Sequence, residues 1–275
     1  MSIGLGIGNS ISGKINGFGG GPSYDPDAVA FFTANESAGG TLSPTVKTEW
    51  DAFVLREKAA SRYSKYLRLY PYLGGVINLA RIDAISLASA TNVNFVDADA
   101  DATCGLQGDG STKYLDTLFK PSTGLAGNNF MFYIINLAGA TTGNLLQGAF
   151  TVTTSFLLYE SLGTSGISSN FNRLSGTTSL PKLAAGSSIY GLRTSNTDLR
   201  IFRDGVQYEI NTTVKLATTL PNINLLAMAT SAYGSPSYYT PSKFGCYMVG
   251  EGLTIADSQG FDTSYKTFLT NIGAI

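Results

Sequence analysis

Three aspartates at alternate positions form the densest cluster of chemistry-bearing side chains in the sequence. Asp97, Asp99 and Asp101 occupy the first, third and fifth positions of a segment that begins like an EF-hand calcium loop. The sixth position is Ala102, where the tight turn needs glycine, and the twelfth is Gly108, where a bidentate glutamate would close the cage. Two interpretations stay open: a weak calcium site completed by backbone carbonyls, and a solvated acidic loop, which the incomplete motif favours.

The acid–base chemistry open to this chain is narrow. No histidine occurs among the 275 residues, so Ser-His-Asp and Cys-His nucleophile systems, His-ligated zinc and histidine general bases are excluded. A retaining glycosidase needs two carboxyl groups about 5 Å apart, and the Glu-x-Asp-x-Glu phrase with which jelly-roll glucanases supply them is absent. Glu160 and Glu209, on predicted strands, have no acidic neighbour two residues away. We therefore expect no catalytic residue and no enzymatic activity.

A tyrosine-rich segment is the best candidate for a contact surface. Residues 231–241 read SAYGSPSYYTP, in which Tyr233, Tyr238 and Tyr239 stand among serine, glycine and proline. Tyrosine offers a rigid amphipathic surface at low entropic cost, as in adaptable binding loops. Two interpretations stay open: a surface that contacts a glycan or a host protein, and an ordinary long connection whose tyrosines pack against the domain, which is favoured.

The cysteines and the single tryptophan favour structural roles. Cys104 and Cys246 are too far apart in the sequence for metal-ligand spacing and too few for a disulfide framework. Two buried free thiols are therefore expected. Trp50 lies on the apolar face of a predicted helix, where a core anchor is favoured over a platform for stacking sugars.

Composition narrows the range of partners. Charged residues make up 13% of the chain, the formal net charge is −1, and no run of like charges occurs. Nucleic-acid binding depends on clustered Lys and Arg, so no nucleic-acid partner is expected. No stretch approaches the roughly 18 apolar residues of a membrane span, and the N-terminus lacks the features of a signal peptide. We expect synthesis in a cytoplasm and no membrane partner.

The N-terminal segment, residues 1–23, is rich in glycine and poor in charge. Within it Ile3, Leu5 and Ile7 alternate with glycine, which is the two-residue period of a strand. Such a strand exposes apolar side chains and unpaired backbone groups unless another chain covers it. We predict a docking segment in which these three residues contact a partner chain. The alternative is a flexible tail.

Residues 24–76 are predicted to form a helical neck that packs on the rest of the chain. A capping residue followed by proline opens one helix at Asp25 and a second at Ser43. Apolar residues then recur at three- and four-residue steps as far as Tyr70, which predicts a long helix with an aromatic inner face. The same spacing returns after Thr254 and predicts a C-terminal helix.

Residues 77–275 are predicted to form an antiparallel β-sandwich that ends in this helix. Ten short runs of β-forming residues, separated by Gly, Asn, Ser and Thr, are typical of that architecture. Asp204 and Gly205 join two of them and are the strongest short hairpin signal. The predicted strands are Lys113–Phe119, Asn129–Leu137, Leu145–Val152, Ser155–Glu160, Ile167–Arg173, Ile189–Arg193, Leu199–Phe202, Val206–Asn211, Asn224–Ala229 and Phe244–Val249.

Five short phrases occur in the order in which a known family carries them. They are YPYLGG at 70–75, GDGSTKYLDT at 108–117, PST at 121–123, FRDG at 202–205 and VGEGLT at 249–254. These phrases resemble bacteriophage virion proteins with a concanavalin A-like, laminin-G-like jelly roll. The resemblance covers the chain from about residue 25 to its end, and it implies a mainly β jelly roll with flanking N-terminal and C-terminal helices.

The resemblance also implies a role. The family supplies tails, fibres and capsid appendages, so the expected function is a non-enzymatic virion structural protein made in the host bacterial cytoplasm without a signal peptide. Its expected partners are other virion proteins, copies of itself as a dimer or trimer, and a host surface glycan or protein. The alternatives are a carbohydrate-binding lectin module and, third, a glycan hydrolase, which the missing carboxylate pair disfavours.

Overall fold

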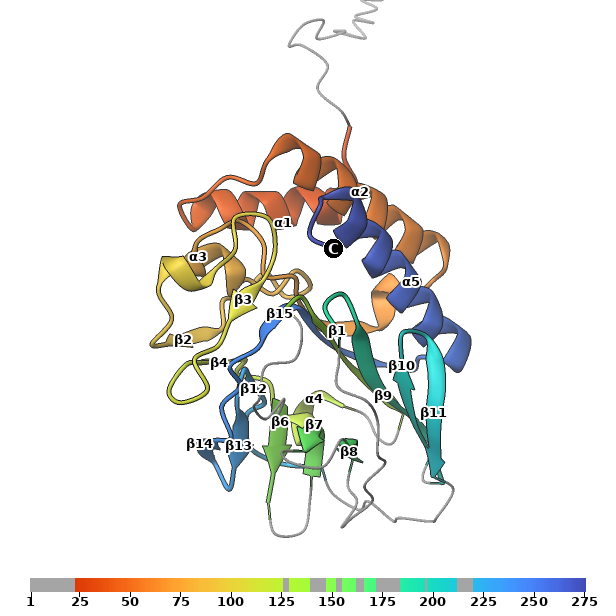
Figure 1. Ribbon diagram of the computed structural model, residues 1–275. Helices are drawn as coiled ribbons and strands as arrows, with labels where there is room; N and C mark the ends of the chain where they lie inside the picture. The colour runs from red at the N-terminus through yellow and green to blue at the C-terminus, as the bar shows by residue number, and fades with distance from the viewer. Residues whose placement is uncertain are drawn as a thin grey trace, which may run out of the picture.

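The computed structural model stacks three layers: a helical layer, an inner β-sheet and an outer β-sheet (Figure 1). The structure describes residues 23–125, 129–138, 147–151, 155–161, 166–171, 184–195, 197–211 and 220–275. Nearly all strand pairs are antiparallel, and the helices flank the sheets. The mainly β sandwich with flanking helices that the sequence predicts is therefore confirmed.

The inner sheet has seven strands and lies between the other two layers. Its path is β1 (Tyr66–Tyr70), β15 (Lys243–Glu251), β5 (Phe130–Asn136), β9 (Ser188–Ser195), β10 (Asp198–Arg203) and β11 (Val206–Asn211), with β3 (Leu106–Gln107) also paired to β15. The β10–β11 hairpin turns at Asp204 and Gly205, whose φ angles of 51° and 77° are those of a primed two-residue turn. The predicted hairpin is confirmed.

The outer sheet has eight strands. Its path is β14 (Ser235–Ser237), β13 (Thr230–Ala232), β6 (Gln147–Phe150), β12 (Leu226–Ala227), β4 (Tyr114–Asp116) and β2 (Thr91–Val93), with β7 (Ser155–Ser161) and β8 (Gly166–Phe171) added beyond β6. Each of the ten predicted runs contains a strand. The sequence did not predict β1, β2, β3, β13 or β14, most of which are only two or three residues long.

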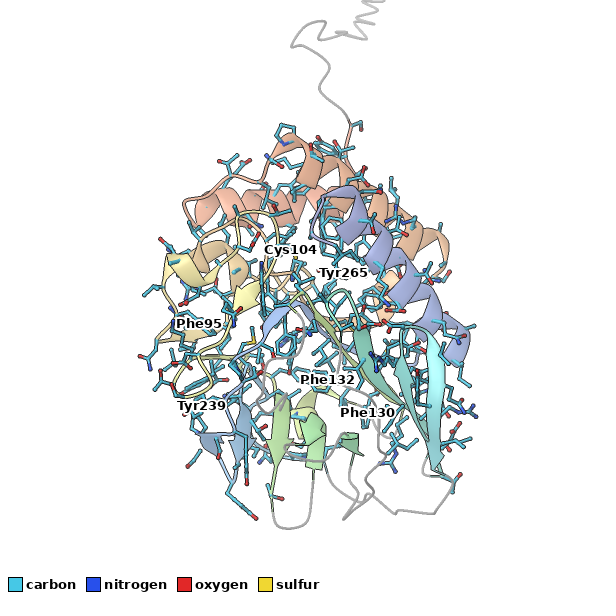
Figure 2. All side chains as sticks on the ribbon, in the orientation of Figure 1. Phe95, Cys104, Phe130, Phe132, Tyr239 and Tyr265 are labelled. Carbon is cyan, nitrogen blue, oxygen red and sulfur yellow. The ribbon has the colours of Figure 1, made fainter. Side chains whose placement is uncertain are left out.

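The central strands of the inner sheet are buried on both faces, and strand β5 shows why such a strand has an apolar sequence. Phe130, Phe132 and Ile134 point into the sandwich core, while Met131 and Tyr133 point toward the helices. Figure 2 places Phe130 and Phe132 between the two sheets. A strand that is covered on both faces has a continuous apolar sequence, because its side chains alternate between two buried, apolar surroundings.

The helical layer consists of α1 (Pro26–Ser37), α2 (Pro44–Ala59) and α5 (Ile255–Asn271). Asp25 and Ser43 cap the first two helices, as the sequence predicts, and the predicted C-terminal helix begins with a capping box at Thr254. Trp50 on α2 is fully buried between Phe31 of α1 and residues of α5. Its predicted role as a core anchor is confirmed. The shorter elements are η1 (Tyr63–Lys65), α3 (Ile77–Ala80), η2 (Asp97–Asp99) and α4 (Pro121–Gly124).

The second helix does not reach Tyr70, which corrects the sequence prediction. It ends at Ala59, and Ser61 takes a φ of 57° that a right-handed helix cannot include. The chain then enters β1, where Leu69 packs under the helices and Tyr70 enters the sandwich core. Both faces of β1 are therefore apolar. Its apolar residues happen to continue the three- and four-residue steps of the preceding helix, which is why the sequence predicted a longer helix.

The docking prediction for residues 1–23 concerns Ile3, Leu5 and Ile7, which lie outside the described residues. In the described part of the chain, no helix combines the length and the apolar character that crossing a bilayer requires.

Candidate functional site

The structure does not gather the three aspartates of the acidic loop, residues 97–101, around a common point. Each carboxylate is held by a different partner, and burial of Asp101 is outweighed by its bond to Lys243, which keeps the pKa of this carboxyl below its usual value. Across the described part of the chain, no group of three such side chains could hold a metal ion. The calcium hypothesis for Asp97, Asp99 and Asp101 therefore has no geometric support. The partners are Ile77 N for Asp97 (3.0 Å), Lys113 Nζ for Asp99 (2.6 Å) and Lys243 Nζ for Asp101.

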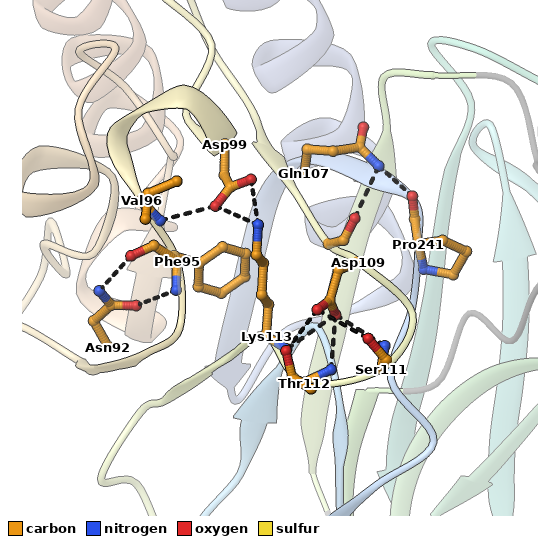
Figure 3. A network of polar contacts seen from close by, with 11 residues as sticks. Asn92, Phe95, Val96, Asp99, Gln107, Asp109, Ser111, Thr112, Lys113 and Pro241 are labelled. Atoms are coloured by element: carbon orange, nitrogen blue, oxygen red, sulfur yellow. Dashed lines mark hydrogen bonds and ion pairs between the residues drawn. The ribbon is translucent and has the colours of Figure 1, made fainter.

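The adjacent GDGST phrase is a self-contained turn built on one carboxylate (Figure 3). Asp109 accepts hydrogen bonds from the backbone N–H groups of Ser111 (2.9 Å), Thr112 (2.8 Å) and Lys113 (3.0 Å). It also accepts hydrogen bonds from the side-chain hydroxyls of Ser111 and Thr112. Burial raises the pKa of Asp109, but these hydrogen bonds outweigh it and hold the pKa well below its usual value. The phrase therefore has a structural role at the entrance to β4.

The tyrosine-rich segment folds into the β13–β14 hairpin and the chain that follows it. Tyr233 forms the two-residue turn together with Gly234, and Tyr238 follows β14. Their side chains are 63% and 49% exposed, so they do not pack as core residues. Tyr239 is half-buried, with its ring centroid 6.2 Å from that of Tyr114 on β4. Figure 2 shows Tyr239 on the side of the molecule that carries this hairpin.

A cavity of about 290 Å³ opens beside this hairpin and is named here the Tyr114 pocket. One wall is β4, where Leu115 points into the core, so Tyr114 and Asp116 point outward from the outer sheet. Asn224 and the hairpin residue Gly234 contribute the facing walls. This volume is just below the usual range for small-molecule sites, about 300–1,000 Å³.

A carboxylate and an amide are held together inside the Tyr114 pocket. Asn224 Nδ2 donates to Asp116 Oδ2 at 3.0 Å, and the backbone N–H of Leu118 donates to Asp116 Oδ1 at 2.9 Å. Each carboxylate oxygen can accept a further hydrogen bond, and the Asn224 amide has further donor and acceptor capacity. The two side chains therefore present fixed polar groups to a ligand.

Tyr114 completes the pocket as a neutral phenol. Burial, then the neighbouring Tyr239 and Asp116, raise its pKa. The phenol therefore keeps its proton at neutral pH, so that it offers an aromatic face and a hydrogen-bond donor. An activated nucleophile would need the opposite shift.

Several backbone conformations of positive φ lie close in sequence to the lining of this pocket. Four of the nine non-glycine residues with positive φ in the described chain are within two positions of a lining residue. They are Leu118 (56°), Met228 (70°), Tyr233 (52°) and Tyr238 (50°). Such residues cost free energy and collect at ligand-binding sites. Leu118, Tyr233 and Tyr238 are exposed, whereas Met228 is buried.

The sequence predicted the tyrosines of this region and missed its polar groups. Tyr114 and Asp116 fall within the GDGSTKYLDT phrase, but nothing in that phrase indicates a ligand site, and Asn224 is 108 positions away from Asp116. The one available signal was the alternation of Tyr114-Leu115-Asp116, which places two polar side chains on the outer face of a strand. The two cysteines are buried free thiols, as predicted, and burial raises the pKa of both.

No protein-family model matches the chain, and no curated protein matches it in sequence. In its fold, the chain is similar to solved structures of sialidases. Trypanosoma rangeli sialidase with 2,3-difluorosialic acid aligns at 12% identity and a TM-score of 0.52, over 81% of this chain and 40% of that one. A mutant of that enzyme with trans-sialidase activity aligns at 12% identity and a TM-score of 0.52, over 80% and 39%. The NanB sialidase of Streptococcus pneumoniae aligns at 12% identity and a TM-score of 0.44, over 57% and 27%.

These structures correct the function expected from the sequence. We expected a non-enzymatic bacteriophage virion structural protein, with a carbohydrate-binding module as the alternative. The two T. rangeli structures are sialidases, a finding that stands against the virion structural role and on the side of the glycan-related alternatives, a lectin module or a glycan hydrolase. The chain spans between about a quarter and two fifths of the length of the sialidases named above. At 12% identity the likeness shows the fold alone.

Proposed function

We propose that the protein is a carbohydrate-binding module that holds a glycan in the Tyr114 pocket without cleaving it. The observation that carries this proposal is the anchored Asp116–Asn224 pair beside the rings of Tyr114 and Tyr239.

The chemistry of this pair suits a sugar ring. Vicinal hydroxyls of a sugar both donate and accept, and the carboxylate of Asp116 and the amide of Asn224 offer the complementary acceptors and donors. The less polar C–H face of a sugar packs against an aromatic ring, which Tyr114 provides at the pocket wall. Fixed polar groups cost little to order on binding, because their own hydrogen bonds already hold them.

The pocket lacks the groups that cleavage needs. Among the described residues, Asp116 is the one carboxylate that lines it, whereas hydrolysis by acid–base chemistry uses two. The raised pKa of Tyr114, which burial causes first, disfavours a role as nucleophile. Binding without turnover is therefore the function that these residues support.

The fold comparison adds one piece of support. A T. rangeli sialidase structure with a similar fold contains 2,3-difluorosialic acid. Because the likeness extends to the fold alone, the identity of the glycan has to come from the residues of the pocket.

Glycan-array binding followed by calorimetry on the strongest hit tests the proposal. Tyr114→Ala and Asn224→Ala should each weaken binding by about tenfold or more, which corresponds to about 1.4 kcal/mol. The matched control is Tyr208→Ala, an exposed tyrosine on β11 of the inner sheet, which should leave the affinity unchanged. Absence of binding to every glycan, or equal loss in the control, would overturn the proposal.

The expectations on location and assembly stay predictions. The resemblance to phage jelly-roll proteins implies a place in the virion, contacts with other virion proteins and with copies of this chain, and docking through residues 1–23. Deletion of residues 2–21 tests the docking segment. The remaining chain should fold and bind glycan as before but lose its partner, and retained assembly would show that the segment is a tail.

A further inference from the structure

The polar groups of the Tyr114 pocket also define the class of sugar that it accepts. We propose that the pocket selects uncharged sugars and discriminates against sialic and uronic acids. This inference rests on the proposed function, and it concerns the charge of the ligand at the same site.

The first step concerns the hydrogen-bond acceptors at the centre of the pocket. Both oxygens of Asp116 are acceptors, and both are fixed, one by Leu118 N at 2.9 Å and the other by Asn224 Nδ2 at 3.0 Å. A ligand group that contacts these oxygens must therefore donate a hydrogen bond. A sugar hydroxyl donates, whereas the carboxylate of an acidic sugar accepts only.

The second step is charge. A ligand carboxylate placed in this small cavity lies within a few ångströms of the Asp116 carboxylate, and like charges at about 4 Å repel even where the dielectric constant is high. The repulsion corresponds to an affinity about fivefold lower or worse. Lys120 is the one cation in the lining, and its side chain is exposed to solvent, which weakens its attraction for an anion.

The third step is the apolar surround. Tyr114 lines the cavity as a neutral phenol, together with the apolar side chains of Ile223, Leu226 and Pro236. These surfaces suit the C–H faces of hexopyranoses. These surfaces carry no positive charge that could compensate an anionic substituent of a sugar.

The experiment compares uncharged and acidic probes on the folded full chain. Lactose, cellobiose and mannobiose are the uncharged probes, and sialyllactose and digalacturonate are the acidic ones. We expect at least one uncharged probe to bind, with every acidic probe at least fivefold weaker. Asp116→Asn should weaken the uncharged probe by about tenfold, because it replaces one acceptor oxygen with a donor and disrupts the bond from Asn224. Asp198→Asn, the same exchange at an ion-paired carboxylate on β10, is the control and should change nothing.

The direction of the Asp116→Asn effect decides the inference. Tighter binding of an acidic probe than of any uncharged one, strengthened by Asp116→Asn and abolished by Lys120→Ala, would overturn it and leave the proposed function standing. Absence of binding to all five probes by a protein with an unchanged melting temperature would count against the proposed function itself. Asn224→Ala, which keeps the Asp116 carboxylate, should also weaken binding of the uncharged probe. This variant replaces Asp116→Asn in the test if Asp116→Asn does not fold.

Discussion

Replacing Trp50 with alanine should destabilise the protein by about 3–5 kcal/mol, the cost of truncating a large, fully buried core side chain. Trp50 is 0% exposed, and its ring lies 4.9 Å from Phe31, 5.1 Å from Phe53 and 5.4 Å from Phe268, centroid to centroid. These neighbours come from all three long helices. The cavity can therefore close only if the helices move together, which favours the upper part of the range.

Trp50→Phe is the matched control. The indole Nε1 has no hydrogen-bond partner among the described residues, so phenylalanine forfeits no hydrogen bond and keeps most of the packing. Its cost should stay below about 1.5 kcal/mol. Urea unfolding followed by circular dichroism measures both variants, since each removes the single tryptophan as a fluorescent probe. A loss below about 1 kcal/mol for Trp50→Ala, or equal losses for the two variants, would refute the anchoring role.

Three further predictions concern charged groups. Arg62→Ala should cost about 3–5 kcal/mol in urea unfolding, because it leaves the fully buried Glu57 carboxylate without its cationic partner at 2.8 Å, and a loss below about 1 kcal/mol would contradict this. Asp109→Ala should cost about 0.5–2 kcal/mol at pH 7 by removing the acceptor of three backbone N–H groups. At Asp109, burial is outweighed by the hydrogen bonds, which leave the folded pKa low. The difference from wild type should therefore be full above about pH 5 and shrink as the pH falls through the unfolded pKa of about 3.9 toward the folded one; a constant difference down to pH 2 would be inconsistent. Calcium should leave the melting temperature unchanged, since the carboxylates of the acidic loop already bind separate partners, and a concentration-dependent rise would restore the calcium hypothesis.

Local signals in the sequence were sufficient for much of the fold. The capping residues Asp25 and Ser43, the Asp204–Gly205 turn and the apolar run of β5 act over a few positions, and each has the predicted structure. Strand β1 was missed because its residues are apolar on both faces, which hides the change of period after Ala59.

The polar groups of the candidate site could not be predicted from local signals in the sequence. Its tyrosines could be recognised from composition, but the Asp116–Asn224 pair depends on β4 and the chain before β12 lying side by side. That neighbourhood is a property of the sheet order, which no local spacing encodes. The acidic loop shows the reverse case: its regular spacing left a calcium site open as the less favoured interpretation, and the separate partners of the carboxylates give that site no support.

Chemical-shift mapping on isotope-labelled protein, titrated with the strongest glycan from the array, tests the central claim most directly. We predict saturable shifts confined to the backbone of residues 114–118, 222–226 and 231–239, which surround the Tyr114 pocket. Saturable shifts that fall instead on the helical layer or on β10 and β11 would contradict the account, because they would place the glycan on a different face of the molecule.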